Sequence, residues 1–213
     1  MNKVINEILR KALHILLSLL LLAPILMKPW IRPEGIYAIA LIVGGWIYSM
    51  QVRGLPHRLK ASMHIPQPKG VEVAVEAFNR LVSLVERDYE RRTGWLGMLS
   101  GLLGVSSTYF LFGDLVTYGI LALVLTDGLS AIVGISLGRT KVPFSDGSLE
   151  GTLAGFLSYL IALLLLGINS TNSVVIAIVS TLSELYGGED NISVPLASTL
   201  IAFLLGVPPL ISQ

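Results

Sequence analysis

Apolar and polar positions follow one another along this chain in long blocks. Seven mostly apolar stretches are separated by polar segments, and they cover residues 12–28, 34–50, 95–113, 115–138, 149–167, 173–187 and 191–208. A helix needs about 17–25 predominantly apolar residues to cross the hydrocarbon core of a bilayer. The pattern therefore predicts an all-α integral membrane protein with about seven transmembrane helices.

The distribution of basic residues predicts how these helices are oriented. With a cytoplasmic N-terminus, all but two of the 15 lysines and arginines fall in cytoplasmic segments, the exceptions being Lys28 and Arg32. Because cytoplasmic loops carry an excess of Lys and Arg, this bias favours an N-in, C-out topology. The same topology places the polar clusters described below on one face. We therefore expect a multi-pass cell-membrane protein whose active site faces the cytoplasm.

One long polar segment, residues 51–94, interrupts the apolar pattern. Three prolines and two glycines lie within residues 54–70 and predict an irregular linker. Residues 71–92 carry apolar side chains at i, i+3 and i+4 among charged ones, which predicts a cytoplasmic amphipathic helix. A lid or lipid-entry element is the alternative. We expect a single polytopic domain over residues 1–213, with this segment as its linker and surface helix.

The composition supports a membrane protein and excludes several kinds of site. Hydrophobic residues make up 53% of the chain and charged residues 14%, whereas soluble domains carry about 25% charged residues. The net charge of +1 gives no indication of a nucleic-acid partner. The chain has no cysteine, which excludes disulfides, thiolate metal sites and cysteine nucleophiles.

Asp127 lies inside an apolar run, where a carboxylate is costly and usually has a function or a charged partner. Small residues follow at helical spacing and form a smooth stripe beside it, made of Ser130, Ala131, Gly134 and Gly138. The stripe predicts either close helix packing or a floor for a flat ligand, and both can hold together. Asp127 lies eleven residues before Gly138, roughly 16 Å along a straight helix. We therefore expect this helix to stop near Gly134 or to bend.

The polar loop that follows, residues 139–148, has the components of a phosphate site. Arg139 and Lys141 supply positive charge, and Ser148 lies at the expected N-cap of the next helix, whose first N–H groups can bind an anion. Glu150 and Gly151 begin that helix. Simple capping, with Glu150 offsetting the helix dipole, is the alternative.

Two further polar groups occur near the ends of the chain. Glu184, Asp190 and Asn191 supply hard oxygen ligands of the type that Mg²⁺ prefers, or they form a solvated turn that caps the last helix. Arg10, Lys11 and His14 lie at the start of the first apolar stretch. Anchoring at the cytoplasmic surface explains the two cations, and His14 alone is more typical of an interfacial residue than of a catalyst.

Together these residues resemble the polyprenol kinase family of membrane enzymes, which includes dolichol kinase, phytol kinase and the yeast-type CTP-dependent diacylglycerol kinase. That family is distantly similar to phosphatidate cytidylyltransferases. The motifs that carry the resemblance are Arg10-Lys11-x-x-His14, Asp127 with Gly134 and Gly138, Lys141-x-Pro143-Phe144, Ser148-x-Glu150-Gly151, and Glu184 followed by Asp190-Asn191-x-x-x-Pro195. Two positions depart from the family pattern, with Ser130 in place of an alanine and Gly147 in place of a lysine.

The resemblance implies phosphoryl transfer from a nucleoside triphosphate, typically CTP, to the hydroxyl of a long-chain isoprenoid alcohol such as dolichol or another polyprenol. It implies catalytic roles for Asp127, Glu150 and His14, and a Mg²⁺ site at Asp190, Asn191 and Glu184. The implied nucleotide-binding residues are Arg10, Lys11, Ser130, Gly134, Gly138, Arg139, Lys141, Ser148 and Gly151. Expected partners are the alcohol or another lipid, the nucleotide, membrane lipids and a second copy of the chain in a homodimer.

Two other functions compete with this lipid kinase. A CDP-lipid synthase, similar to phosphatidate cytidylyltransferase, would use the same CTP and Mg²⁺ at the same membrane face. A non-enzymatic lipid transporter or scaffold is the second alternative. Transport sites usually lie near the bilayer midplane, whereas the polar groups here gather at one predicted face.

Overall fold

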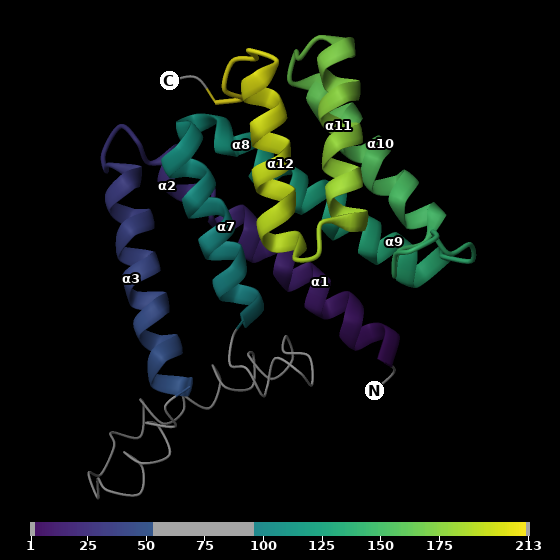
Figure 1. Cartoon of the computed structure of the whole chain (residues 1–213), viewed down its shortest axis with the longest axis horizontal. Helices are drawn as coiled ribbons and strands as arrows, with labels where there is room; N and C mark the ends of the chain where they lie inside the picture. The colour runs from purple at the N-terminus through teal and green to yellow at the C-terminus, as the bar shows by residue number, and fades with distance from the viewer. Residues whose placement is uncertain (1–2, 53–95, 212–213) are drawn as a thin grey trace, which may run out of the picture.

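The computed structural model of this chain describes residues 3–52 and 96–211 (Figure 1). The described part is helical and confirms the predicted all-α class. Its α-helices are α1 (Lys3–Leu20), α2 (Ala23–Leu26), α3 (Pro33–Val52), α7 (Leu96–Phe112), α8 (Val116–Ala122), α9 (Ser130–Leu137), α10 (Leu149–Leu165), α11 (Ser170–Tyr186) and α12 (Asp190–Leu204). The predicted linker at 54–70 and the predicted amphipathic helix at 71–92 lie outside the described residues.

Two segments that are not α-helical lie between α7 and α9, one before α8 and one after it. Residues Gly113–Leu115 form a 3₁₀ turn, η1, and residues Leu123–Leu129 form a π-helical segment, η2. Gly113 has a φ of 59°, a left-handed conformation that glycine adopts without steric cost, and α7 therefore ends there. The polypeptide reverses after α7 and continues through α8, η2 and α9 as one long helical stretch (Figure 1).

Two helical stretches in the described part are long and apolar enough to cross a membrane. They are Glu7–Leu26 and Leu99–Leu137, and the second contains the turn at Gly113. The helices Leu149–Leu165 and Asp190–Leu204 are apolar but shorter. From α3 onward, the described helices lie within a few residues of the predicted apolar stretches. The stretch 12–28 differs, because α1 begins at Lys3 and ends at Leu20, and α2 follows as a separate short helix.

The side chains are distributed with many apolar groups outside and many hydroxyl groups inside. The outer face of α10 carries an apolar row at every fourth position, formed by Leu149, Leu153, Leu157 and Ile161. Similar exposed rows occur on α11 and α12. The buried polar residues between the helices include Ser106, Thr108, Ser173, Ser180, Thr181, Ser198 and Thr199. The described interior of the bundle therefore contains many hydroxyl groups.

A buried hydroxyl network joins α8, α10 and α12 at the centre of the bundle. The hydroxyl of Tyr159 donates to the carbonyl of Tyr118 at 2.9 Å and lies 2.7 Å from Oγ of Ser198. Gly119 lets α8 approach α12 closely, since a Cβ at this position would lie 2.6 Å from the carbonyl oxygen of Pro195. This close packing fixes the start of η2, the segment that carries Asp127.

Candidate functional site

Asp127 lies in the π-helical segment η2, with its side chain 4% exposed. π-Helices are rare, occur mostly as single turns and are frequently found at functional sites. The expectation that this helix stops near Gly134 is wrong, because α9 continues to Leu137. The departure from α-helical geometry occurs instead at Asp127 itself.

Two basic side chains of α1 contact the carboxylate of Asp127. Nζ of Lys11 lies 2.7 Å from Oδ1, and Nε2 of His14 lies 3.0 Å from Oδ2. Both side chains retain some exposure, 13% for Lys11 and 23% for His14. Because a buried carboxylate is stable only when it is paired, this contact explains how an apolar helix tolerates Asp127.

A second acidic side chain, that of Glu184 in α11, is connected to Asp127 by hydrogen bonds through Ser130. Oγ of Ser130 donates to Oε1 of Glu184 at 2.9 Å and lies 3.1 Å from the backbone carbonyl oxygen of Asp127. Oε2 of Glu184 is buried and has no hydrogen-bond partner among the described residues.

These contacts bring together five residues from α1, η2, α9 and α11, which we call the Asp127 cluster. Its members are Lys11, His14, Asp127, Ser130 and Glu184. The cluster combines two carboxylates, a lysine, a histidine and a hydroxyl, and its two basic side chains are partly exposed. It therefore has the groups needed to bind an anion, to orient a hydroxyl and to accept a proton.

The small-residue stripe packs against α10. A Cβ at Gly151 would lie 2.4 Å from the carbonyl oxygen of Ser130, and one at Gly155 would lie 2.6 Å from that of Thr126. At the end of α9, a Cβ at Gly138 would lie 2.6 Å from Oγ of Ser148. These approaches confirm close helix packing along the stripe.

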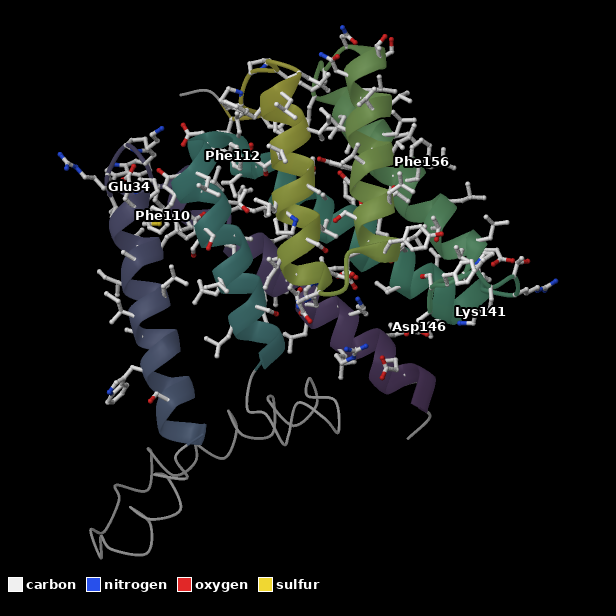
Figure 2. The ribbon with its side chains drawn as sticks, viewed as in Figure 1. Glu34, Phe110, Phe112, Lys141, Asp146 and Phe156 are labelled. Atoms are coloured by element: carbon white, nitrogen blue, oxygen red, sulfur yellow. The ribbon has the colours of Figure 1, made fainter. Side chains whose placement is uncertain are left out.

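The loop 139–148 is held by hydrogen bonds within its own region. The carboxylate of Glu150 accepts the backbone N–H groups of Arg139 at 3.1 Å and Thr140 at 3.2 Å. Nζ of Lys141 donates to the carbonyl of Asp146 at 2.8 Å, and Figure 2 shows both residues at the outer edge of the bundle. Ser148 is the N-cap of α10 and accepts the N–H of Gly151 at 3.2 Å, which confirms the predicted cap. Glu150 thus holds the loop.

Asn191 and its acidic neighbours lie at the start of α12. Nδ2 of Asn191 donates to Oγ of Ser100 at 3.2 Å, and Ser100 in turn donates to Glu189 at 2.9 Å. These contacts connect α12 to α7. Within residues 3–52 and 96–211, no group of three His, Asp or Glu side chains lies close enough to hold a metal ion. The predicted Mg²⁺ ligands therefore do not form a complete protein cage in the described part.

Arg10 does not join the Asp127 cluster, although Lys11 and His14 do. Its guanidinium pairs with Glu7, one turn earlier on α1, at 2.6 Å. Sequence reasoning did not identify Glu7, although the spacing of three residues on one helix face is a recognisable signal for this ion pair.

At the opposite end of the bundle, where Figure 2 labels Glu34, Lys28 pairs with Asp114 and Tyr109 donates to Glu34 at 2.9 Å.

Comparison of the chain with family models, with curated proteins and with solved structures gave no match. The function must therefore be argued from the chain's own residues and their geometry.

Proposed function

We propose that this chain is a multi-pass membrane kinase that phosphorylates the hydroxyl of a long-chain isoprenoid alcohol, with CTP as the phosphoryl donor. The observation that carries the proposal is the Asp127 cluster. Two motifs of the resemblance, Arg10-Lys11-x-x-His14 and the Asp127 helix, are 116 positions apart, yet Lys11 and Asp127 are in direct contact. Contact between them is what a shared active site requires.

The distribution of side chains supports the membrane part of the proposal. Exposed leucines and isoleucines cover the outer faces of α10, α11 and α12, while serine and threonine hydroxyls lie between the helices. In a bilayer, helices associate through small and hydroxyl-bearing residues and present apolar residues to lipid. This arrangement favours membrane-spanning helices. The distribution of lysines and arginines favours an N-terminus in the cytoplasm, which would put the Asp127 cluster nearer the cytoplasmic side.

The cluster supports phosphoryl transfer through charge and alignment. That reaction needs the γ-phosphate held in line with the attacking oxygen and its charge neutralised. Lys11 is partly exposed and can turn from Asp127 toward a phosphate oxygen. The carboxylate of Asp127 then becomes available to accept the hydrogen bond, and finally the proton, of the lipid hydroxyl. His14 stays within reach of the same carboxylate and limits its movement.

Mg²⁺ fits this site through Glu184. Its buried Oε2 has no hydrogen-bond partner in the described part, and Asp190 begins α12, a short turn after the α11 helix that carries Glu184. Mg²⁺ in phosphoryl-transfer sites is commonly held by one or two carboxylates together with substrate phosphates and water, so a three-ligand protein cage is not required. Glu184 and Asp190 would hold the ion, which would supply charge neutralisation at the triphosphate.

The loop 139–148 has a supporting role in this proposal. Glu150 is engaged with the backbone of Arg139 and Thr140, and we assign it to holding the loop. The side chains of Arg139 and Lys141 are exposed beside the start of α10 and are available to the nucleotide phosphates. The lipid would enter sideways from the bilayer.

A transfer assay with CTP labelled separately at the α and γ phosphates tests the proposal. The purified protein in lipid nanodiscs is incubated with Mg²⁺ and with dolichol, geranylgeraniol, phytol or diacylglycerol. Label from the γ position in the lipid is the expected result. Label from the α position would identify a CDP-lipid synthase. Transfer of neither label, with no shift in melting temperature on adding CTP and Mg²⁺, would favour a transporter or scaffold.

A further inference from the structure

Phe144, at the tip of the loop 139–148, combines an exposed ring with a left-handed backbone. Its side chain is 99% exposed, and its φ of 59° is the single positive φ of a non-glycine residue in the described part. A bulky residue rarely adopts this conformation, and such strain persists only where the surroundings impose it. An apolar ring in water and a strained backbone are both unfavourable, so their coincidence at one residue calls for an explanation.

The loop imposes this conformation through hydrogen bonds on both sides of Phe144. The N–H of Val142 donates to the carbonyl of Gly147 at 3.2 Å, and that of Leu149 donates to the carbonyl of Thr140 at 2.8 Å. Lys141 and Ser148 form an antiparallel bridge. The loop is therefore a closed hairpin that presents the ring of Phe144 outward.

The surroundings of the loop indicate what covers the ring. Leu137, the last residue of α9, and Leu149, the first of α10, are exposed and adjoin the loop. Leu149 begins the exposed apolar row that continues along α10 through Leu153 and Leu157. Phe144 thus lies beyond the end of a surface that faces lipid in the proposed arrangement. Aromatic rings and basic side chains such as Arg139 and Lys141 are typical of the membrane–water interface.

We propose that Phe144 inserts at the boundary between the headgroups and the acyl chains of the bilayer and anchors the loop 139–148 at the membrane surface. The inference rests on the proposed membrane-spanning arrangement. The ring gains an apolar environment, which offsets its strained backbone. The anchor fixes the height of the α10 N-terminus, and with it the exposed cations of the loop, relative to the lipid surface.

The absence of native cysteine allows a direct test with single-cysteine variants that carry an environment-sensitive fluorophore. Phe144→Cys is the test position, and Asp146→Cys is the exposed polar control in the same loop. Leu157→Cys, on the outer face of α10, reports whether that face contacts lipid. Each labelled protein is placed in nanodiscs and quenched either by nitroxide-bearing lipids or by iodide in the water.

The expected result is loss of emission with nitroxide lipids at 144 and 157, and loss with iodide at 146. Quenching of 144 by iodide, with 157 quenched by lipid, would overturn the anchor and leave the spanning arrangement intact. Quenching of 157 by iodide would overturn both. Protection of 144 from iodide only when CTP and Mg²⁺ are added would place position 144 at a nucleotide site and also overturn the anchor.

Discussion

Nζ of Lys11 lies 2.7 Å from Oδ1 of Asp127, joining the first helix of the chain to the π-helical segment η2. Both side chains are largely buried, and His14 contacts the other carboxylate oxygen. A buried ion pair of this kind adds little net stability over an apolar pair, whereas the loss of one partner leaves an uncompensated charge. Removing both charges should therefore affect the free energy of unfolding much less than removing one, whereas any loss of Asp127 should reduce activity in the proposed function.

We expect Asp127→Leu to destabilise the protein by about 3–5 kcal/mol, because it leaves the largely buried Lys11 without its ion-pair partner. Lys11→Met should cost less, because His14 still contacts the carboxylate of Asp127. The double variant should recover most of this loss, since both charges are then removed. Unfolding by denaturant in mixed micelles measures the three free energies. Additive losses in the double variant would show that the two charges do not depend on one another for stability.

Phosphoryl transfer should respond differently, because in the proposed function the carboxylate itself accepts the proton of the lipid hydroxyl. Asp127→Asn keeps the size of the side chain and removes its basicity, and a positioned proton acceptor contributes about 10²–10⁴-fold to a rate. We expect a loss of γ-label transfer in this range. Asp114→Asn, which breaks the ion pair with Lys28 far from the cluster, is the matched control and should retain activity. Full activity of Asp127→Asn in folded protein would remove Asp127 from the mechanism.

The helices and one cap were predictable from local sequence. Apolar stretches bounded by Gly, Pro and charged residues gave the helices near their observed places, and the Ser148 cap followed from its position before an apolar run. The π-helical geometry at Asp127 was not predictable, because no residue pattern distinguishes a π turn from an α turn. The depth of Asp127 in its helix predicted that the helix stops near Gly134 or bends, and it did not predict a π-helical segment at Asp127.

The contacts that Asp127 and Glu150 make in the site were less predictable than the fact that these residues have polar partners. A costly carboxylate in an apolar helix indicated that Asp127 has a partner, but only the three-dimensional packing shows that Lys11 and His14 supply it. Glu150 was predicted as a catalytic group because of its place in a motif. Its hydrogen bonds to the backbone of Arg139 and Thr140 depend on how the loop folds back, which local sequence does not encode.

The close approach of α9 and α10 predicts a strong effect at Gly151. An added Cβ would lie 2.4 Å from the backbone oxygen of Ser130, which cannot move away as a flexible side chain would. Gly151→Ala should therefore cost about 1–3 kcal/mol of stability, as overpacking does. Gly45→Ala in α3, where a Cβ meets nothing within 4 Å, is the control and should not destabilise the protein. Equal stabilities of the two variants would contradict the observed packing.

Glu150 can be tested by a change that keeps its shape. The side-chain oxygen of Gln can still accept the N–H groups of Arg139 and Thr140, but Gln cannot act as a general base. If Glu150 holds the loop, Glu150→Gln should remain active and Glu150→Ala should lose activity. A loss of about 10²–10⁴-fold in Glu150→Gln would instead assign it to proton transfer. Initial rates of γ-label transfer, with melting temperatures as a check on folding, distinguish the two roles.

The unpartnered Oε2 of Glu184 predicts a change in the Mg²⁺ requirement. Glu184→Gln removes the charge but keeps the hydrogen bond from Ser130 to the side-chain oxygen. If Glu184 holds the ion, the Mg²⁺ concentration for half-maximal γ-label transfer should rise by at least about 10–100-fold, the loss seen even when outer ligands of a metal site are removed.

Ser130→Ala is the matched control for Glu184→Gln, because it removes the hydrogen bond and leaves the carboxyl group in place. It should affect the maximal rate more than the Mg²⁺ requirement. An unchanged Mg²⁺ requirement in Glu184→Gln would show that Glu184 holds Ser130 and the neighbouring backbone of η2 in place without binding the ion.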